Sequence, residues 1–391
     1  YNHPDGGLQY AYNYFVGLPT AEQCGGALPE TLPIILHIEG HGSRYIDGPD
    51  QGNSSSYFCA LEIWGDSPRQ AWYYGFSATY DYRDGYEYPS MPDAGPIVNY
   101  AEARLLRTIY DTLRDADYAA YNLDDQRIYV YGHSMGGSGA LALAMRYPNV
   151  FAASFSSEPM TNYRTSGGGE ADVDWTEECQ AKWGSIAANF PISNVGRYAG
   201  HLAPYNGTGV WDWQNHQANL VSRGGDEMAH ISLAHGSRDH VIEWSTQGQP
   251  AYGAFYDGHR AFSGVTVDMD HTWTSFVGLG PTVGDTGDGP FHGFSVVRDE
   301  TIPGLSNASG SSTVPPSGAG AAYNMNLEWS ASWNDWDGAP VDTASEWRIS
   351  LRTTEGPDQT VDVTPRRVQT FALTPGVYTI TLTAEIGRET R

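Results

Sequence analysis

The sequence predicts an α/β fold followed by a small β-rich tail, and three observations support this prediction. Over the first 300 residues, apolar strand patterns alternate with helical patterns, which is typical of a parallel sheet flanked by helices. One strand, in residues 127–131, runs into a glycine-rich turn and an alanine-rich helix. After residue 300, short alternating patterns separated by turn residues take over, as in antiparallel β structure.

The composition is that of an acidic chain, long enough at 391 residues for one large domain and a small one. It carries 46 acidic and 21 basic residues, a formal net charge of −25, and Lys182 is its single lysine. Such a charge repels phosphates, so nucleic acid is excluded as a partner. The sequence contains no run of about 18 apolar residues, the length that a membrane span needs.

An acidic surface nearly free of lysine is typical of proteins from salt-tolerant or marine bacteria, in which dense carboxylates keep the protein hydrated. A GC-rich genome would explain the lysine deficit but not the excess of acid. The chain begins at Tyr1, without a methionine or signal peptide. From this beginning we expect a mature bacterial protein that is secreted or periplasmic.

The three cysteines, Cys24, Cys59 and Cys179, form no C-x-x-C pair, which argues against a zinc or redox motif. Cys24 and Cys59 flank the first strongly apolar strand and are the preferred disulfide pair. This pairing leaves Cys179 free.

The first part of the chain predicts an edge strand in residues 10–16 and a buried strand in residues 32–38, LPIILHI. The buried strand runs directly into Glu39-Gly40-His41-Gly42. A long aromatic segment follows, in which residues 71–77 are expected to enter the sheet. Residues 97–113 have the apolar spacing of one helix face.

Residues 127–147, RIYVYGHSMGGSGALALAMRY, predict a strand, a sharp turn and a helix, and residues 132–136 fit G-x-S-x-G. A serine hydroxyl is a weak nucleophile unless a strained turn holds it near a base and near the amides of the following helix. Ser134 is therefore the candidate nucleophile. Backbone amides of Met135 and of Gly40 or His41 are the candidate oxyanion hole, with a plain βα turn as the alternative for the loop at Gly40.

Residues 151–157 predict another strand, and residues 159–228 form a long insertion of the kind that often serves as a lid or cap. The insertion contains four tryptophans, which form either a small core or a platform for an aromatic or sugar ring. Core packing is the favoured interpretation. The tryptophans are Trp175, Trp183, Trp211 and Trp213.

Two further strands, residues 230–234 and 264–269, lead into HGSRD and DHTW. Asp239 is the candidate acid and His271 the candidate base. Asp268 and Asp270 lie too close to His271 in sequence to reach the far nitrogen of its ring. His292 is the second candidate for the base.

After residue 301 the composition changes. Residues 302–322 are rich in Ser, Gly and Pro and predict a linker, whereas residues 323–391 predict a small antiparallel β-sandwich. Residues 285–289 and 334–338 have oxygen-rich sequences similar to calcium-binding loops. We interpret both as turns, because neither has the ligand spacing of an EF-hand, with calcium binding as the alternative.

With GHSMGG, HGSRD and DHTW together, residues 1–301 resemble an α/β-hydrolase. Within that superfamily they are most similar to secreted bacterial serine esterases of the polyhydroxybutyrate-depolymerase and feruloyl-esterase type. The resemblance implies a mostly parallel eight-stranded sheet, a catalytic triad of Ser134, His271 and Asp239, and neither a metal nor another cofactor. The tail resembles a fibronectin type III-like module.

The leading hypothesis is a secreted serine carboxylic-ester hydrolase that forms an acyl-enzyme. Its substrate would be a small or polymeric ester: a polyester, an acylated carbohydrate or an aromatic ester. A prolyl-oligopeptidase-like serine peptidase is the alternative enzyme, and a catalytically silent binding protein with a hydrolase fold is the alternative from another class. The sequence leaves the acyl specificity and the oligomeric state open.

The net charge generates a prediction about salt. Repulsion among surface carboxylates destabilises the compact state at low ionic strength, and salt screens it over a Debye length of about 10 Å at 0.1 M. The melting temperature should therefore rise between low salt and about 1 M NaCl. A flat or falling curve in differential scanning fluorimetry would contradict the halotolerant interpretation.

Overall fold

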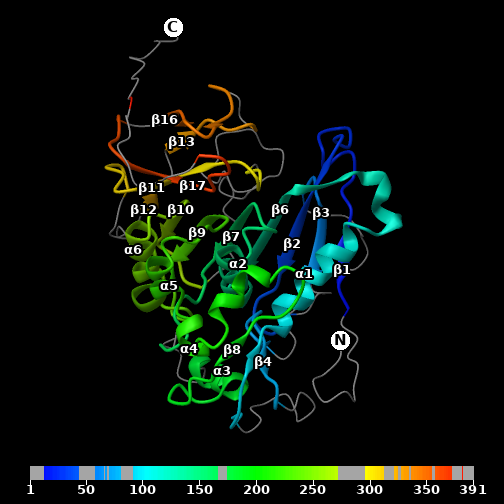
Figure 1. Ribbon diagram of the computed structural model, residues 1–391, viewed down its shortest axis with the longest axis vertical. Helices are drawn as coiled ribbons and strands as arrows, with labels where there is room; N and C mark the ends of the chain where they lie inside the picture. The colour runs from blue at the N-terminus through cyan, green and yellow to red at the C-terminus, as the bar shows by residue number, and fades with distance from the viewer. Residues whose placement is uncertain are drawn as a thin grey trace.

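The computed structural model describes residues 13–43, 58–65, 67, 70–80, 91–165, 174–271, 296–311, 321–324, 327–333, 336–354, 357–371 and 381. In Figure 1 the larger α/β part lies below, and the β-rich tail lies above it.

An eight-stranded sheet forms the centre of the fold (Figure 1), with strand order β1–β3–β2–β6–β7–β9–β10–β12. The six inner strands are parallel, and the two edge strands β1 and β12 run antiparallel to their neighbours. The mostly parallel sheet of the prediction is therefore confirmed. The strands are β1 Phe15–Gly17, β2 Leu32–Ile38, β3 Leu61–Gly65, β6 Leu123–His133, β7 Ala153–Ser157, β9 His230–Gly236, β10 Phe262–Val267 and β12 Ala321–Tyr323.

Helices cover this sheet, and short strands lie outside it. The helices are α1 Tyr100–Thr112, α2 Met135–Arg146, α3 Trp175–Trp183, α4 Val210–Trp213, α5 His216–Ser222 and α6 Gln249–Asp257, with shorter helical turns η2 Ala116–Tyr121, η3 Gly200–Tyr205 and η4 Trp244–Gly248. A separate three-stranded sheet contains β4 Phe76–Ser77, β5 Ile97–Val98 and β8 Ile192–Ser193. No helix in the described ranges is long and apolar enough to cross a membrane.

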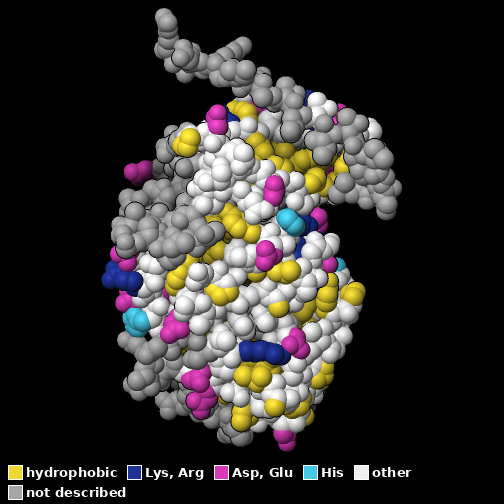
Figure 2. All heavy atoms as spheres, turned by 90° about the vertical axis from the view of Figure 1, so that its left-hand side faces the viewer, with side chains coloured by type: hydrophobic (Ala, Val, Ile, Leu, Met, Phe, Trp, Pro, Cys, Tyr) yellow, Lys and Arg dark blue, Asp and Glu magenta, His cyan; other side chains and the backbone are white. Residues whose placement is uncertain are grey.

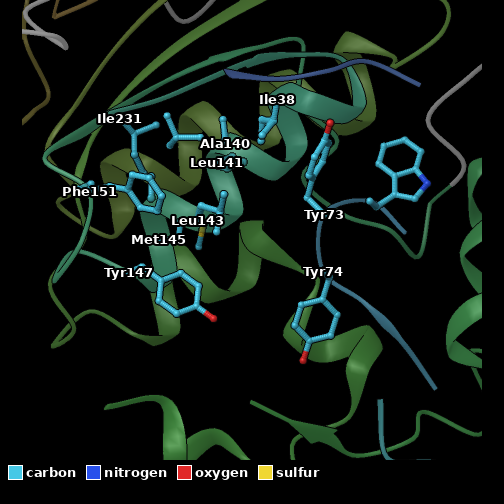
Figure 3. Close-up of a cluster of buried hydrophobic side chains, with 14 of the residues drawn as sticks. Ile38, Tyr73, Tyr74, Ala140, Leu141, Leu143, Met145, Tyr147, Phe151 and Ile231 are labelled. Atoms are coloured by element: carbon cyan, nitrogen blue, oxygen red, sulfur yellow. The ribbon is translucent and has the colours of Figure 1, made fainter. Parts of the chain in front are cut away.

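The core is built around α2, every residue of which is buried. A helix surrounded by other elements has no solvent face, which explains why its sequence, MGGSGALALAMR, lacks the usual polar stripe. Figure 3 shows Leu141 and Met145 of this helix packed beside Phe151 and Ile231. The small glycines and alanines let the helix lie close to the sheet that carries the nucleophile strand.

The structure corrects one predicted strand. Residues 71–77 do not enter the central sheet; β3 takes that place beside β2. Trp72 and Tyr73 have positive φ angles of 49° and 59°, which break an extended strand. The β3 sequence was missed because Glu62 interrupts its apolar pattern, although this carboxylate is buried and accepts hydrogen bonds from the Phe58 amide and the Trp64 indole.

The disulfide prediction is confirmed, because Cys24 and Cys59 are bonded and Cys179 is free and buried. The bond joins the segment before β2 to the residue two positions before β3, and so ties together two neighbouring strands of the sheet.

The tryptophans of the insertion are part of the main core, which confirms the packing interpretation. Trp183 and Trp211 are fully buried, Trp213 is 2% exposed and Trp175 is 7% exposed. None of the four forms an exposed platform: the Trp183 ring contacts Trp211 and Tyr163, while Trp175 contacts Trp72 and Trp213 contacts Tyr205.

The tail differs from the predicted linker and sandwich. Residues 302–306, expected in the linker, form the buried strand β11 Ile302–Ser306, and residues 321–323 complete the central sheet as β12. The described part of the tail forms three two-stranded antiparallel sheets. They contain β11 with β17 Asp362–Arg366, β13 Leu327–Trp329 with β16 Leu351–Thr353, and β14 Val341–Asp342 with β15 Trp347–Arg348.

These sheets are consistent with a small β domain but do not define a sandwich. The composition concealed β11, because IPGLS contains a proline and a glycine and yet is buried at every position. The oxygen-rich segment 285–289 lies outside the described residues.

Two adjacent arginines fasten the tail to the α/β part. The Arg366 guanidinium donates hydrogen bonds to the carbonyls of His259, Gly224 and Gly258. Arg367 is 3% exposed and donates to Ala152 O at 3.0 Å and Val297 O at 2.7 Å. Ala152 and His259 lie just before β7 and β10, so the tail docks at the amino ends of the parallel strands.

The acidic residues on one face of the molecule are spread apart. On the face shown in Figure 2, Asp and Glu side chains lie scattered rather than gathered in one patch. A general repulsion therefore describes the effect of the net charge better than a single acidic binding site does.

The anchoring arginine yields a stability prediction. Arg367→Met should destabilise the fold by about 2–4 kcal/mol, because two buried carbonyls lose a charged donor. Hydrolytic activity on a soluble ester should persist at a temperature where the protein is folded. The matched control is Arg348→Met, since the Arg348 side chain is 68% exposed. Equal unfolding curves for the two variants would contradict the anchoring role.

Candidate active site

The candidate site lies where the carboxyl ends of the parallel strands meet. The ends of β2, β6, β9 and β10 lead to the predicted site residues, and β7 adds Glu158. Loops at this edge of a parallel sheet are the usual place for a ligand site. The predicted residues are Gly40 and His41 after β2, Ser134 after β6, Asp239 after β9 and His271 after β10.

Ser134 occupies the sharp turn between β6 and α2, with φ 58° and ψ −121°. A non-glycine residue in this region is strained by about 1–3 kcal/mol. The surroundings hold the turn, because the Ser134 amide donates to Ser157 O at 2.9 Å and the Ser138 hydroxyl donates to Ser134 O at 2.8 Å. The strain thus projects the hydroxyl away from the sheet.

Glycine at position 136 is required by close approach. A Cβ atom there would lie 2.1 Å from the carbonyl oxygen of Ile38 at the end of β2. A Cβ atom at Gly132 would lie 2.4 Å from the backbone of Gly136. Only glycine at both positions lets the first turn of α2 lie against the strand ends.

The structure brings Ser134, His271 and Asp239 together. His271 Nε2 lies 2.9 Å from Ser134 Oγ, and His271 Nδ1 lies 2.8 Å from Asp239 Oδ2. An ionised carboxylate only accepts hydrogen bonds, so Nδ1 carries the proton and the lone pair of Nε2 faces the serine hydroxyl. The other oxygen of Asp239 accepts the amides of Val241 and Ile242, both at 2.8 Å. This is the arrangement that a proton-accepting imidazole needs.

The competing acids lie elsewhere. Asp270 Oδ1 accepts the backbone amide of His271 at 2.7 Å and also contacts the ring of His240. Asp268 pairs with Arg238 at 2.6 Å. Neither carboxylate binds the far nitrogen of the His271 ring. His292, the second candidate for the base, lies outside the described residues.

The candidate oxyanion loop lies beside the nucleophile. A Cβ atom at Gly40 would be 4.0 Å from the Cβ of Ser134. Met135 is the first residue of α2, and the first amides of a helix have no acceptor within the helix. The His41 ring is directed to α3, with Nε2 2.9 Å from Glu178 Oε2, so the backbone amide is what His41 offers to a substrate oxygen.

Helix α3 of the insertion contacts both sides of the site. Besides the hydrogen bond between Glu178 and His41, the Trp175 indole donates to Val241 O at 2.9 Å, in the turn that contains Asp239. Lys182 Nζ lies 2.9 Å from the second oxygen of Glu178. Burial alone would raise the pKa of Glu178, but the hydrogen bond from His41 and the charge of Lys182 hold this pKa below its ordinary value. The insertion therefore fixes the position of the loop at Gly40.

Sequence reasoning missed Tyr73. Its hydroxyl donates to Glu39 O at 2.7 Å, and its ring packs where Gly139 of α2 has no side chain. Tyr73 thus connects the candidate oxyanion loop to the nucleophile helix. A tyrosine within a long aromatic segment carries no signal of such a role, because the positive φ that orients it depends on the folded turn.

Sequence reasoning also missed Glu158. Its side chain is fully buried, and Oε2 lies 3.2 Å from His271 Nδ1 and 3.5 Å from His133 Nδ1. Burial, followed by the charge of His271, lowers the pKa of His133 to about 3, so that ring is neutral at neutral pH.

Among the described residues, this group of Glu158 and two histidines has a spacing that suits a metal ion. A metal needs the lone pair of Nδ1, whereas the hydrogen bond from His271 Nδ1 to Asp239 requires a proton on that nitrogen. We therefore assign no metal to these residues.

A mostly parallel sheet with a serine in a strained turn, a histidine and an acid at its carboxyl edge supports a serine hydrolase of the α/β-hydrolase fold. Residues 81–266 match the family described as putative esterase. This span contains Ser134 and Asp239, whereas Gly40 and His271 lie outside it. The match and the sheet together support an esterase of this fold.

Other comparisons show distant likeness. No curated protein matches the sequence. An S-formylglutathione hydrolase from Agrobacterium tumefaciens is 14% identical, with 66% of this chain and 82% of that chain covered and a TM-score of 0.40. A ferulic acid esterase is 13% identical, with 66% and 85% covered and a TM-score of 0.40. An acylaminoacyl peptidase from Pyrococcus horikoshii is 13% identical, with 69% of this chain and 37% of that chain covered and a TM-score of 0.42.

The contact of Tyr73 yields a prediction about the rate. Tyr73→Phe removes the bond to Glu39 O and should lower kcat by about 3- to 10-fold while destabilising the fold by about 1 kcal/mol. Tyr129→Phe is the matched control, since its buried hydroxyl donates to Val296 O at 3.0 Å away from the site. The kinetic measurements should show a lower kcat for Tyr73→Phe than for Tyr129→Phe, whereas the melting curves should show similar stability for the two variants. An unchanged kcat in Tyr73→Phe would show that this tyrosine does not position the loop.

Proposed function

We propose that this protein is a secreted serine carboxylic-ester hydrolase that works through an acyl-enzyme. The observation that carries the proposal is the hydrogen-bonded row of Ser134, His271 and Asp239, with distances of 2.9 Å and 2.8 Å between neighbours. We propose a polyester, an acylated carbohydrate or an aromatic ester as the substrate.

In the first half of the reaction, Ser134 Oγ attacks the acyl carbonyl as its proton passes to His271 Nε2. Asp239 holds the proton of Nδ1 and stabilises the imidazolium that forms. The carbonyl oxygen becomes an oxyanion, to which the amides of Met135 and of Gly40 or His41 donate. His271 then gives its proton to the departing alkoxide, and the acyl group remains on Ser134.

In the second half, water attacks the acyl-enzyme as His271 removes its proton. The collapse of the second tetrahedral intermediate returns the proton to Ser134 and releases the carboxylic acid. The strained turn at Ser134 and the fixed loop at Gly40 favour this reaction because donors and nucleophile need little rearrangement.

Two observations support the proposed location and substrate class. The disulfide between Cys24 and Cys59 is typical of proteins that mature in an oxidising compartment, which supports secretion. The match of residues 81–266 to an esterase family supports an ester over a peptide substrate.

Ser134→Ala is expected to reduce hydrolysis of p-nitrophenyl acetate by about 10³-fold or more without loss of the fold, because the members of a triad act as a unit. His271→Ala should be equally damaging. The control is His259→Asn, since His259 precedes β10 at the opposite edge of the sheet and its φ of 49° is tolerated by asparagine. If Ser134→Ala kept more than about a tenth of the wild-type rate, the nucleophile would be misassigned.

The same assay distinguishes the alternatives. A serine peptidase would cleave peptide p-nitroanilides as well as the activated p-nitrophenyl esters, an esterase would cleave only the esters, and a silent hydrolase-fold protein would cleave neither. A panel of acetylated xylan, feruloylated sugars, polyesters and simple acyl esters would then identify the acyl group.

A further inference from the structure

We propose that Glu158 is a second positioning carboxylate for His271, sharing the Nδ1 proton with Asp239. This inference rests on the proposed function, since it assigns a role within the same reaction. It adds a fourth residue to a site for which the sequence predicts three.

The geometry at His271 Nδ1 is that of one donor facing two acceptors. Asp239 Oδ2 lies at 2.8 Å and Glu158 Oε2 at 3.2 Å. Both carboxylates are fully buried, so water screens neither charge. The shorter distance makes Asp239 the main acceptor, and Glu158 lies close enough to accept the same proton when the ring shifts slightly.

The backbone at Glu158 adopts a strained conformation. Glu158 follows the last residue of β7 with a positive φ of 49°, a conformation that strains a residue with a side chain. Its amide donates to Ala234 O of β9 at 2.7 Å, which continues the pairing of the two strands. The chain therefore turns at the strand end, where the Glu158 side chain lies against the rings of His133 and His271.

The neighbouring strand leaves room for the carboxylate. Gly236 ends β9, and a Cβ atom there would lie 3.0 Å from Glu158 Oε1 and 2.5 Å from the carbonyl oxygen of Met269. A side chain at position 236 would therefore displace Glu158 or the segment before His271. Gly236 thus lies against both Glu158 and the turn that contains His271.

A buried carboxylate destabilises a fold unless a positive charge or hydrogen bonds compensate for the lost water. Glu158 lies beside two imidazoles. Burial keeps the His133 ring neutral, with a pKa of about 3, whereas His271 becomes positively charged when it takes the proton of Ser134. The charge of Glu158 thus stabilises the transition state more than the resting state, which is what accelerates a reaction.

Several other groups face His271 and contribute to its environment. Burial, the largest cause, lowers the pKa of His235, so this ring is neutral like that of His133. The exposed Asp270 acts on the backbone amide of His271 and not on its ring. The groups that face His271 are His133 of β6, Glu158 after β7, His235 and Asp239 of β9 and its turn, and Asp270 with its partner His240.

The first experiment is a double-mutant cycle on p-nitrophenyl acetate with Asp239→Ala and Glu158→Met. Methionine has the length of glutamate and removes both charge and acceptor, and apolar replacement of a buried ionic group is often well tolerated. Glu158→Met should lower kcat by about threefold in the wild type but by about tenfold or more in Asp239→Ala, where Glu158 alone orients the ring. Equal effects in the two backgrounds would overturn the proposal.

The second experiment uses the pH profile, which a merely structural role would not move. Glu158→Gln removes the charge and keeps the size, so the protonated form of His271 loses stabilisation. The acidic limb of kcat/KM should then shift to lower pH by about 0.5–1 unit, whereas an unchanged limb would overturn the proposal. A folded fraction that is constant across the pH range lowers kcat/KM without moving the limb, and circular dichroism over the same range verifies this for each variant.

Glu62→Gln is the matched control, since Glu62 is also fully buried in the sheet but binds the Phe58 amide and the Trp64 indole. The acidic limb of kcat/KM in Glu62→Gln should stay at its wild-type pH. Ser134→Ala separates the two proposals: if it remains active, the proposed function fails. If it is inactive while the Glu158 variants show neither effect, only the role of Glu158 fails.

Discussion

The contact between the first turn of α2 and the carboxyl end of β2 constrains the whole site. Because Gly136 packs directly under the carbonyl of Ile38, the chain must reverse sharply at Ser134. That reversal places the serine hydroxyl beside the loop at Gly40 and within hydrogen-bond distance of His271, the candidate base after β10. A side chain at Gly136 would push α2 away from the sheet and separate nucleophile, loop and base at once.

Two buried carboxylates lie beside His271 at the carboxyl edge of the sheet. In the proposed reaction His271 Nε2 accepts a proton, and two carboxylates, from β7 and from the turn after β9, face Nδ1 of the same ring. Neighbouring imidazoles stay neutral because burial lowers their pKa values. Under the proposed mechanism the carboxylates lie where a positive charge forms during turnover, and each contributing strand end adds one part of this environment.

Buried arginines fasten the additions to the sheet. Arg146 of α2 pairs with Glu102 and donates to Gln214 of the insertion, and Arg367 of the tail donates to carbonyls of the α/β part. A guanidinium offers five donors fixed in one plane, so one side chain can satisfy several buried acceptors, whereas a lysine ammonium offers three. In a chain with a single lysine, the insertion and the tail are thus joined to the core by directed hydrogen bonds as well as by apolar packing.

The sequence by itself determined the parallel sheet, the turn at Ser134, the disulfide and the placement of Asp239 and His271 at neighbouring strand ends, because these depend on local patterns and on the rule that parallel strands end at one edge. It did not reveal β3, β11, Tyr73 or Glu158. Glu62 interrupts the apolar pattern of β3, and a proline and a glycine interrupt that of β11. Tyr73 and Glu158 have positive φ angles, and their partners lie far away in sequence. Only the tertiary structure decided these, since a buried carboxylate gains its role from the groups that folding brings within hydrogen-bond distance.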